Sequence, residues 1–475
     1  METRLPPGPP LPLWVQTLLL SLGVQRYLDA CHRRYGRTFT VRAASFGKFV
    51  NITDPADVKA VFAGDPAVYH GGEANTHLGD LVGLSSVLLL DEAQHRRRRA
   101  LMTPPFHGKA VRRQSEVMAE VTVAEVDGWP AGRPFPLLPR MQALTLEVIL
   151  RTVIGVHDGD RLAALRQALP PLADIGPMLM MRLMYPQLRQ RWPWSRYDHR
   201  RAVADTLLRA EIEHARRDPR LEERPDVLAM LIQARDDDCK PMPDGELRDQ
   251  LVTLLLVGYE TTATALAWTF ERLVRHPEVL RRATEAAESG DDEYLDAVAK
   301  ESMRVRPIVF NVARRLTAPV ELGGYRLPAG IYVAAAMGLV QRSERHYREP
   351  GEFRPERFLD GQVDPSTWFP FGGGVRRCLG ATFASVEMRI VLREVLRRVE
   401  LAVTEAPAER VHMRHITLVP SRGATVTVAR RKEPGSVSGS PHGETSDAPR
   451  ATLLSSFPHA AASACRSRPA SAAQR

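Results

Sequence analysis

A single cysteine, Cys378, stands in the stretch that carries the most chemistry in this chain of 475 residues. It follows three consecutive glycines, residues 372–374, and precedes an apolar-periodic segment typical of a helix. Unpaired backbone N–H groups at a helix start favour the thiolate form of a cysteine, and a thiolate is a ligand for a soft metal ion. The glycines would let a large planar ligand lie flat on the backbone, and Arg376 could pair with a carboxylate of that ligand.

Haem has these features, because its iron is a soft metal centre and its planar ring carries carboxylates. Residues 371–380 resemble, position for position, the haem-binding loop Phe-Gly-x-Gly-x-Arg-x-Cys-x-Gly of the cytochrome P-450 family of haem-thiolate monooxygenases. The alternative is a glycine-rich turn with a buried structural cysteine, the usual fate of a free cysteine. The resemblance implies Cys378 as the iron ligand, and Gly372, Arg376 and Gly380 as residues that contact haem b, iron protoporphyrin IX.

Length and composition indicate a globular protein. Hydrophobic residues make up 44% of the chain and charged residues 25%. No linker-like break occurs before about residue 431, so we expect one haem-thiolate monooxygenase domain over residues 1–430. Residues 431–475 hold few sizeable apolar side chains, and we expect them to form a disordered tail.

The net charge of +9 favours an acidic electron-transfer partner over nucleic acid. The arginines are dispersed, and the one dense run, residues 96–99, has no interleaved aromatic residues. We expect Arg96, Arg97 and Arg98 to lie on the basic face that meets the electron donor.

Cysteine usage and the start of the chain indicate the compartment. Four widely spaced cysteines suit a reducing environment. The apolar run of residues 11–24 contains Pro12 and falls short of the ~18 residues that cross a bilayer. We therefore expect a cytoplasmic protein without a transmembrane anchor.

A long helix is expected from about residue 246 to His276, with Asp244 as N-cap and Pro277 as its stop. About thirty residues give roughly 45 Å, enough to cross a domain. Within it stand Glu260 and the β-branched Thr261 and Thr262. Each threonine costs a helix up to ~0.7 kcal/mol relative to alanine, which is tolerated more readily where hydroxyls are needed.

Residues 257–262 resemble the family motif of a small residue, Gly, any residue, an acid, Thr and a second Thr or Ser. The resemblance implies that Gly258 admits the oxygen ligand and the haem, that Thr261 hydrogen-bonds the ligand, and that Glu260 relays protons from water. Val257 departs mildly from the family pattern, and we expect it to narrow the space above the iron. Glutamate and threonine on a solvated helix face are the alternative interpretation.

Glu301 and Arg304 stand three residues apart on one face of an expected helix. As an exposed pair they would contribute only ~0.2–0.5 kcal/mol. Residues 353–358 resemble the family segment whose arginine closes a buried triad. The resemblance implies that Glu301, Arg304 and Arg357 lock this helix to the haem loop, a structural role that needs all three partners because an unpaired buried charge is costly.

His95 and Arg99, four residues apart, share one face of a helix expected to begin near Asp91. The resemblance implies that they contact the haem propionates, with Arg314 as the third contact and Arg315 as the competing choice. A solvated polar face is the alternative for His95.

These matches run in family order over residues 6–430 and imply a fold. It is mainly helical with small β-sheets on one side (α+β), and haem lies between the long central helix and the helix that follows Cys378. Local patterns add strands near residues 38–41, 48–52 and 320–337 and helices near residues 110–128, 141–155, 160–170 and 199–216.

The implied function is monooxygenation of an organic substrate with O₂. The substrate is expected to be lipophilic, because the candidate pocket segments 78–90, 174–184 and 307–313 are rich in apolar residues. The sequence holds no reductase motif, so electrons are expected from a ferredoxin or flavodoxin-type donor with its reductase. A peroxide-driven or isomerising haem-thiolate enzyme would not need Glu260 with Thr261, and a non-enzymatic haem sensor would need neither these residues nor a donor.

Overall fold

The computed structural model describes residues 5–44, 47–173, 187, 195–361, 363–414 and 416–432. Most of the expected tail and the candidate pocket segment 174–184 lie outside the described residues.

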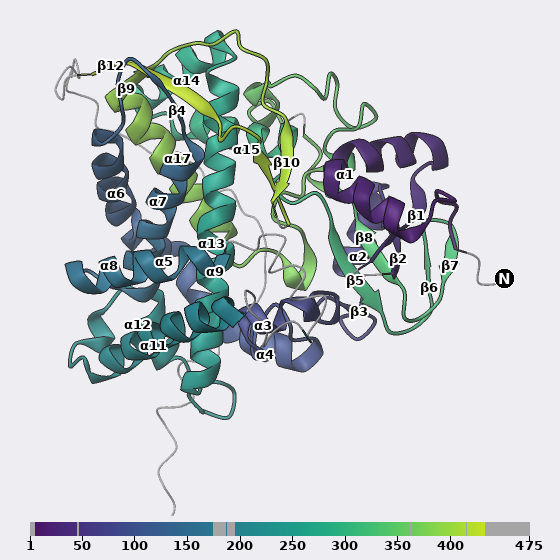
Figure 1. The fold of residues 1–475 in the computed structure, drawn as a ribbon, viewed down its shortest axis with the longest axis horizontal. Coiled ribbons are helices and arrows are strands. Elements are labelled where there is room, and N and C mark those ends of the chain that lie inside the picture. The colour runs from purple at the N-terminus through teal and green to yellow at the C-terminus, as the bar shows by residue number, and fades with distance from the viewer. Residues whose placement is uncertain are drawn as a thin grey trace, which may run out of the picture.

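The described chain forms a helical body beside a smaller β-region (Figure 1). The helices of the N-terminal half are α1 (Leu13–Tyr35), α2 (Pro55–Ala63), α3 (Gly79–Val82), α4 (Glu92–Met102), α5 (Gly108–Arg113), α6 (Ser115–Asp127), α7 (Leu138–Ile149, continued by one π-turn), α8 (Gly159–Ala168), α9 (Pro170–Ala173) and α11 (Ser195–Arg217). Those that follow are α12 (Val227–Gln233), α13 (Asp244–Leu273), α14 (Pro277–Ser289), α15 (Asp292–Val305), α16 (Met337–Val340) and α17 (Ala381–Arg398).

The largest sheet has five strands in the order β1-β2-β8-β5-β3, with β2 and β8 parallel and the other pairs antiparallel. Its strands are β1 (Thr38–Ala43), β2 (Gly47–Ile52), β3 (Tyr69–His70), β5 (Val312–Leu316) and β8 (Tyr332–Ala335). Val333 and Ala334 point to opposite faces, as period-two geometry requires, and belong to two different apolar clusters. The sheet is therefore covered on both faces.

Three smaller sheets complete the β-structure: β6-β7, β10-β11 and β4-β12-β9. Their strands are β4 (Pro134–Pro136), β6 (Val320–Leu322), β7 (Tyr325–Leu327), β9 (Val399–Leu401), β10 (Val411–Arg414), β11 (Thr417–Pro420) and β12 (Thr425–Arg431). The fold is mainly helical with small sheets, as expected, but the β4-β12-β9 sheet lies among the helices and not beside the five-stranded sheet (Figure 1).

Helix α13 runs through the helical body and is buried over most of its length (Figure 1). Among the described residues it is the one helix long and apolar enough to cross a membrane, and 72% of its apolar window lies inside the protein. Trp268 ties it to β11 by donating to the carbonyl oxygen of Leu418 over 2.7 Å. The length of this helix follows from its place at the centre of the core.

The ends of α13 differ from the predicted ends. Asp244 was predicted to be the N-cap, but it is the first helical residue, Pro243 holds the cap position, and no side chain caps the helix. The Asp244 carboxylate instead accepts hydrogen bonds from Arg216 of α11. The helix also ends at Leu273, before Pro277, which opens α14.

Glu301, Arg304 and Arg357 meet in one buried cluster. Arg304 pairs with both carboxylate oxygens of Glu301, at 2.7 and 2.9 Å, and Arg357 Nε lies 3.3 Å from Glu301 Oε1. Arg304 also donates to the carbonyl oxygens of Gln341, Pro350 and Glu352 at 2.9–3.0 Å. These bonds join α15 to the segment that leads into the Cys378 loop.

We predict that Arg304→Met lowers the free energy of unfolding by roughly 3–5 kcal/mol, because it leaves Glu301 buried with a weakened partner set. Arg281→Met is the matched control. Arg281 is exposed and, within the part of the chain that the structure describes, pairs with Glu278 and Glu285 on its own helix, so its loss should change stability little. Urea unfolding followed by circular dichroism measures both, and equal stability of the two variants would contradict the structural role.

Candidate functional site

The Cys378 loop is shaped by close contact with α2. Gly374 has a φ of +63°, and a Cβ atom on it would lie 1.7 Å from the carbonyl oxygen of Phe62. Gly372 also has a positive φ, +65°. The backbone N–H of Cys378 donates to Phe371 O over 2.9 Å, which closes the loop. Glycine is therefore required at residue 374 by packing against α2 as well as by backbone conformation.

The thiol of Cys378 is accessible, although protein atoms lie close around it. Burial raises the pKa of Cys378, and the hydrogen bond from the Gly380 N–H and the charges of Arg377 and Arg99 offset this only in part. The predicted backbone contribution is present, because the Gly380 N–H lowers the pKa of Cys378, but burial outweighs it, and a cation bound to the sulfur would supply the remaining stabilisation.

One face of α13 is accessible in the middle of the buried helix. Val257 is 37% exposed, and Gly258 and Thr261 are partly exposed, whereas Tyr259, Glu260 and Thr262 are buried. The accessible residues share a face because four positions make about one helical turn. The hydroxyl of Thr261 donates to Val257 O over 2.7 Å, which leaves its oxygen able to accept another hydrogen bond.

Gly258 lies close to α7 and is also partly exposed on the accessible face of α13. A Cβ atom at this position would lie 2.6 Å from Cδ1 of Ile149, the end of a side chain on α7. That Gly258 admits a ligand stays a prediction.

Glu260 points away from the accessible face and lies against the β10-β11 hairpin. Its Oε1 is 3.6 Å from Nε of Arg414 on β10. The sequence analysis did not name Arg414, because no motif surrounds it and only the fold brings the hairpin to α13.

Four cationic or basic side chains gather beside the loop. His95, Arg314 and Arg376 line one pocket with Asp91, and Arg99 donates to the carbonyl oxygen of Arg377 over 2.7 Å. Burial and the charges of Arg376 and Arg99 lower the pKa of His95 to about 4, so it is neutral at pH 7. Burial and Arg376 likewise lower the pKa of Arg314 to about 10.

Arg314 and Arg315, the two candidates for the third propionate contact, point to opposite faces of strand β5. Arg314 is buried and lies in this pocket, whereas Arg315 is exposed on the other face and pairs with Glu73.

Arg98 does not lie on an exposed basic face, contrary to the prediction. It pairs with Glu246 of α13, and only Arg96 and Arg97 of the three are exposed.

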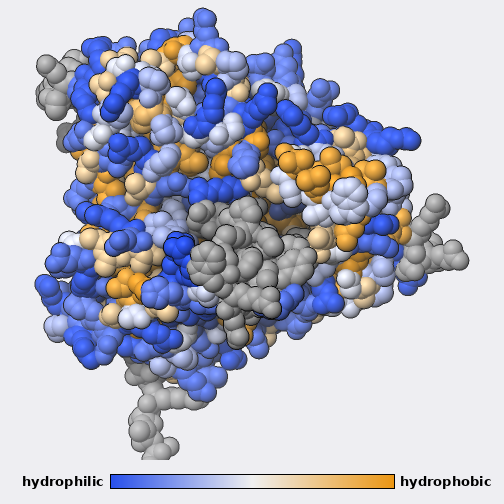
Figure 2. Space-filling view, viewed as in Figure 1, coloured by the Kyte–Doolittle hydropathy of each residue, from blue (hydrophilic) through white to orange (hydrophobic). Residues whose placement is uncertain are grey.

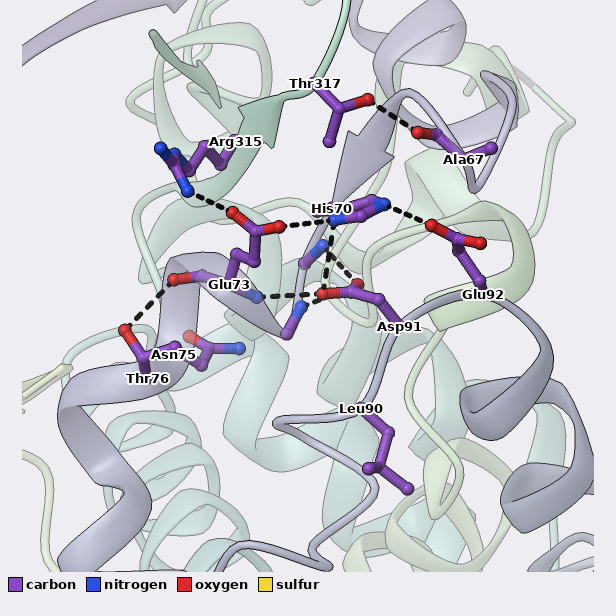
Figure 3. Close-up of polar contacts among 12 residues, drawn as sticks. Ala67, His70, Glu73, Asn75, Thr76, Leu90, Asp91, Glu92, Arg315 and Thr317 are labelled. Atoms are coloured by element: carbon purple, nitrogen blue, oxygen red, sulfur yellow. Dashed lines mark hydrogen bonds and ion pairs between the residues drawn. The ribbon is translucent and has the colours of Figure 1, made fainter. Parts of the chain in front are cut away.

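Asp91 connects three parts of this region, and Figure 3 shows its bonds to the turn at residues 71–73. Its carboxylate accepts the backbone N–H groups of Gly71, Gly72 and Glu73, each at 2.9 Å, and pairs with Arg376 at 2.5 Å. Asp91 holds the N-cap position of α4 without capping it, because its side chain is used by the preceding turn.

His70 lies beside Asp91 and between two further carboxylates (Figure 3). Its Nδ1 is 2.8 Å from Glu73 Oε1, and its Nε2 is 3.0 Å from Glu92 Oε1. Only the imidazolium form donates from both ring nitrogens. Burial lowers the pKa of His70, but the bonds to Glu73 and Glu92 and the charge of Asp91 outweigh burial, and the net shift is upward. No motif surrounds His70, so the sequence gives no sign of this cluster.

The residues present fit a haem group. Arg99, Arg314 and Arg376 bring three positive charges. Two carboxylates also line the pocket, Asp91 paired with Arg376 and Glu92 paired with His70. The excess of positive charge suits the anionic propionates of haem, and it lies close to the thiol of Cys378, which precedes α17.

Fold and site together define a haem-thiolate protein, and comparison with known proteins identifies the family. A family model described as Cytochrome P450 matches residues 6–428. The chain belongs to this family. It is therefore an oxidoreductase of the monooxygenase class that uses haem iron.

Relatives and a solved structure support the assignment. The chain is 52% identical over 435 residues to cytochrome P450 135B1 of Mycobacterium tuberculosis, which covers 90% of this chain and 92% of the relative. It is 42% identical to cytochrome P450 135A1 of the same species, over 93% of this chain and 98% of the relative. The structure of retinoic acid bound cyanobacterial CYP120A1 shares the fold, with a TM-score of 0.78, 21% identity, and coverage of 91% of this chain and 100% of that chain.

We predict that His70→Gln lowers stability most at acidic pH. Because the folded pKa of His70 is raised above its unfolded value, its contribution is fully present below about pH 6.5 and is lost as pH rises through the folded pKa. The difference in melting temperature between the wild type and His70→Gln should therefore narrow from pH 6 to pH 9. His107→Gln, at an exposed position, is the control, and a difference for His70→Gln that does not change with pH would contradict the assignment.

Proposed function

We propose that this protein inserts one oxygen atom from O₂ into a lipophilic organic substrate and receives electrons from a separate ferredoxin or flavodoxin-type donor with its reductase. The observation that carries the proposal is that Cys378 in the loop and Thr261 on the central helix are both accessible, in a chain that belongs to the cytochrome P450 family. We also propose a cytoplasmic location, and a single domain over residues 1–430 followed by a tail.

The proposed haem b would be held by residues from several segments. Cys378 would bind the iron, Gly372 and Gly380 would leave room along the ring, and the propionates would contact His95, Arg99, Arg314 and Arg376. When bound, haem supplies electron transfer and O₂ activation, and thiolate ligation favours cleavage of the O–O bond.

Two residues of α13, Glu260 and Thr261, would donate and position the protons that oxygenation needs. The Arg414 guanidinium lies beside the Glu260 carboxylate on the side of α13 that faces the hairpin. From there Glu260 would pass protons toward the accessible face. The Thr261 oxygen, whose own proton is directed to Val257 O, can accept a hydrogen bond from a group on the accessible face. In this proposal the Thr261 oxygen positions a proton donor on the accessible face, and Glu260 is the source of the proton.

A lipophilic substrate is supported by apolar side chains of the candidate pocket segments. Leu78, Val87, Leu89 and Ile308, from two of the candidate pocket segments, are apolar and only partly buried. Such residues favour binding of an apolar body and offer few polar groups for orientation.

Replacement of Thr261 tests the proposed chemistry. Thr261→Ala should keep haem and substrate binding and keep consuming reductant, while product per electron falls several-fold and hydrogen peroxide rises, because proton delivery is misdirected. The matched control is Thr262→Ala, which removes a buried hydroxyl about 100° further round the helix.

NADPH consumption, peroxide and product are measured together with a surrogate ferredoxin and reductase. Full coupling in Thr261→Ala, with the loss in Thr262→Ala, would mean that the wrong threonine has been assigned. If no substrate in a lipophilic screen gives oxygenated product with the wild type, the monooxygenase proposal itself fails.

A further inference from the structure

In the first half of α1 a polar side chain is buried and apolar side chains are exposed, the reverse of the usual arrangement. Gln16 is completely buried, whereas Trp14, Leu18 and Leu22 are 70%, 49% and 75% exposed. The three apolar residues follow each other at four-residue intervals and so lie along one face. The segment ends at Gly23, whose φ of −175° and ψ of 70° interrupt the helix.

Hydrogen bonds fix this orientation. The Gln16 amide donates to Pro9 O at 3.2 Å and Leu11 O at 2.8 Å, and its oxygen accepts from Tyr27 Oη at 3.1 Å and from Arg42 N at 3.0 Å. Rotation of the helix to bury the leucines would break all four bonds and leave polar groups unpaired. The apolar face is therefore held outward by the fold.

The exposed face forms a patch. Leu11 and Leu13 are also exposed and extend the row formed by Trp14, Leu18 and Leu22. Figure 2 shows hydrophobic residues gathered over the position of α1. Single exposed apolar side chains are ordinary, but a contiguous patch indicates a binding surface.

Basic residues border the patch. Arg42 and Lys48 are exposed cross-strand partners in β1 and β2. Their hairpin is fixed to α1 by the bond from Arg42 N to Gln16 and by one from Ala44 N to Thr17 Oγ1, 3.0 Å long. Arg26, further along α1, is exposed as well.

Acidic residues do not balance this charge. Among the described residues from 5 to 48, Asp29 is the one acid, and it lies 3.7 Å from Arg342. The surface thus combines an apolar row with a positive border, which matches the charge of anionic lipid headgroups.

We propose that the first half of α1 and the β1-β2 hairpin dock on an anionic membrane surface. Ten helical residues, about 15 Å long, cannot cross a bilayer core of about 30 Å, so the helix lies in the interface. Trp14 suits that depth, because tryptophan favours the boundary between headgroups and acyl chains.

A second copy of the chain is a poorer occupant. A twofold contact through the patch would bring the same basic residues of both copies together, and their repulsion opposes association. The membrane proposal goes beyond the proposed oxygenation and does not depend on it.

Vesicle flotation of the haem-loaded full chain tests the proposal. Wild type should bind vesicles of equal parts phosphatidylcholine and phosphatidylglycerol at least about tenfold more tightly than pure phosphatidylcholine vesicles, and added salt should weaken this binding. Trp14→Ser/Leu18→Ser/Leu22→Ser should lose at least about tenfold in binding to the mixed vesicles. Arg42→Glu/Lys48→Glu should lose the preference for the anionic lipid.

The control is Val403→Ser, at an exposed apolar residue outside the patch, and it should bind as the wild type does. All variants should retain the wild-type haem spectrum, which shows that they fold. The proposal is overturned if the wild type does not bind the mixed vesicles at low salt, or if the triple serine variant binds them as well as the wild type. A wild-type dimer that the triple variant converts to a monomer, without vesicle binding, would identify a second copy as the occupant.

Discussion

The accumulation of positive charge beside the Cys378 loop is the constraint on which the site depends. Arg99, Arg314 and Arg376 come from α4, β5 and the loop. Burial lowers the pKa of each, and a nearby like charge adds to this: Arg377 at Arg99, Arg376 at Arg314 and Arg99 at Arg376. Asp91 relieves part of the repulsion and connects the turn at residues 71–73 to the loop through Arg376. A dianionic group such as haem would complete the balance, so cofactor binding and local folding are coupled.

Paired buried charges also hold the surrounding elements in register. Glu301 with Arg304 and Arg357 fastens α15 to the approach to the loop, and Glu260 with Arg414 fastens α13 to the β10-β11 hairpin. Each pair joins segments distant in sequence, and each would be costly to break on one side. The positions of Cys378 and of the accessible face of α13 thus depend on ion pairs that include neither Cys378 nor Thr261.

The predictions that were confirmed depend on patterns among neighbouring residues. Those that were wrong concern residues whose contacts come from distant segments of the chain. The helical fold and the central helix follow from periodicity, which is a property of neighbouring residues. Asp244 and Arg98 have partners on other elements, Arg216 and Glu246, and these partners determine their roles. The reversed face of α1 could not be predicted either, because the orientation of Gln16 depends on Arg42.

The most direct test of the account is the spectrum of the reduced carbon monoxide complex in two cysteine variants. Cys31 is the matched control, since it is the other free thiol among the described residues and lies buried in α1. Cys31→Ser should keep the wild-type spectrum. Cys378→Ser should either fail to retain haem or give a complex that absorbs at shorter wavelength, because thiolate donation is lost. An unchanged spectrum in Cys378→Ser would contradict the assignment of Cys378 as the iron ligand.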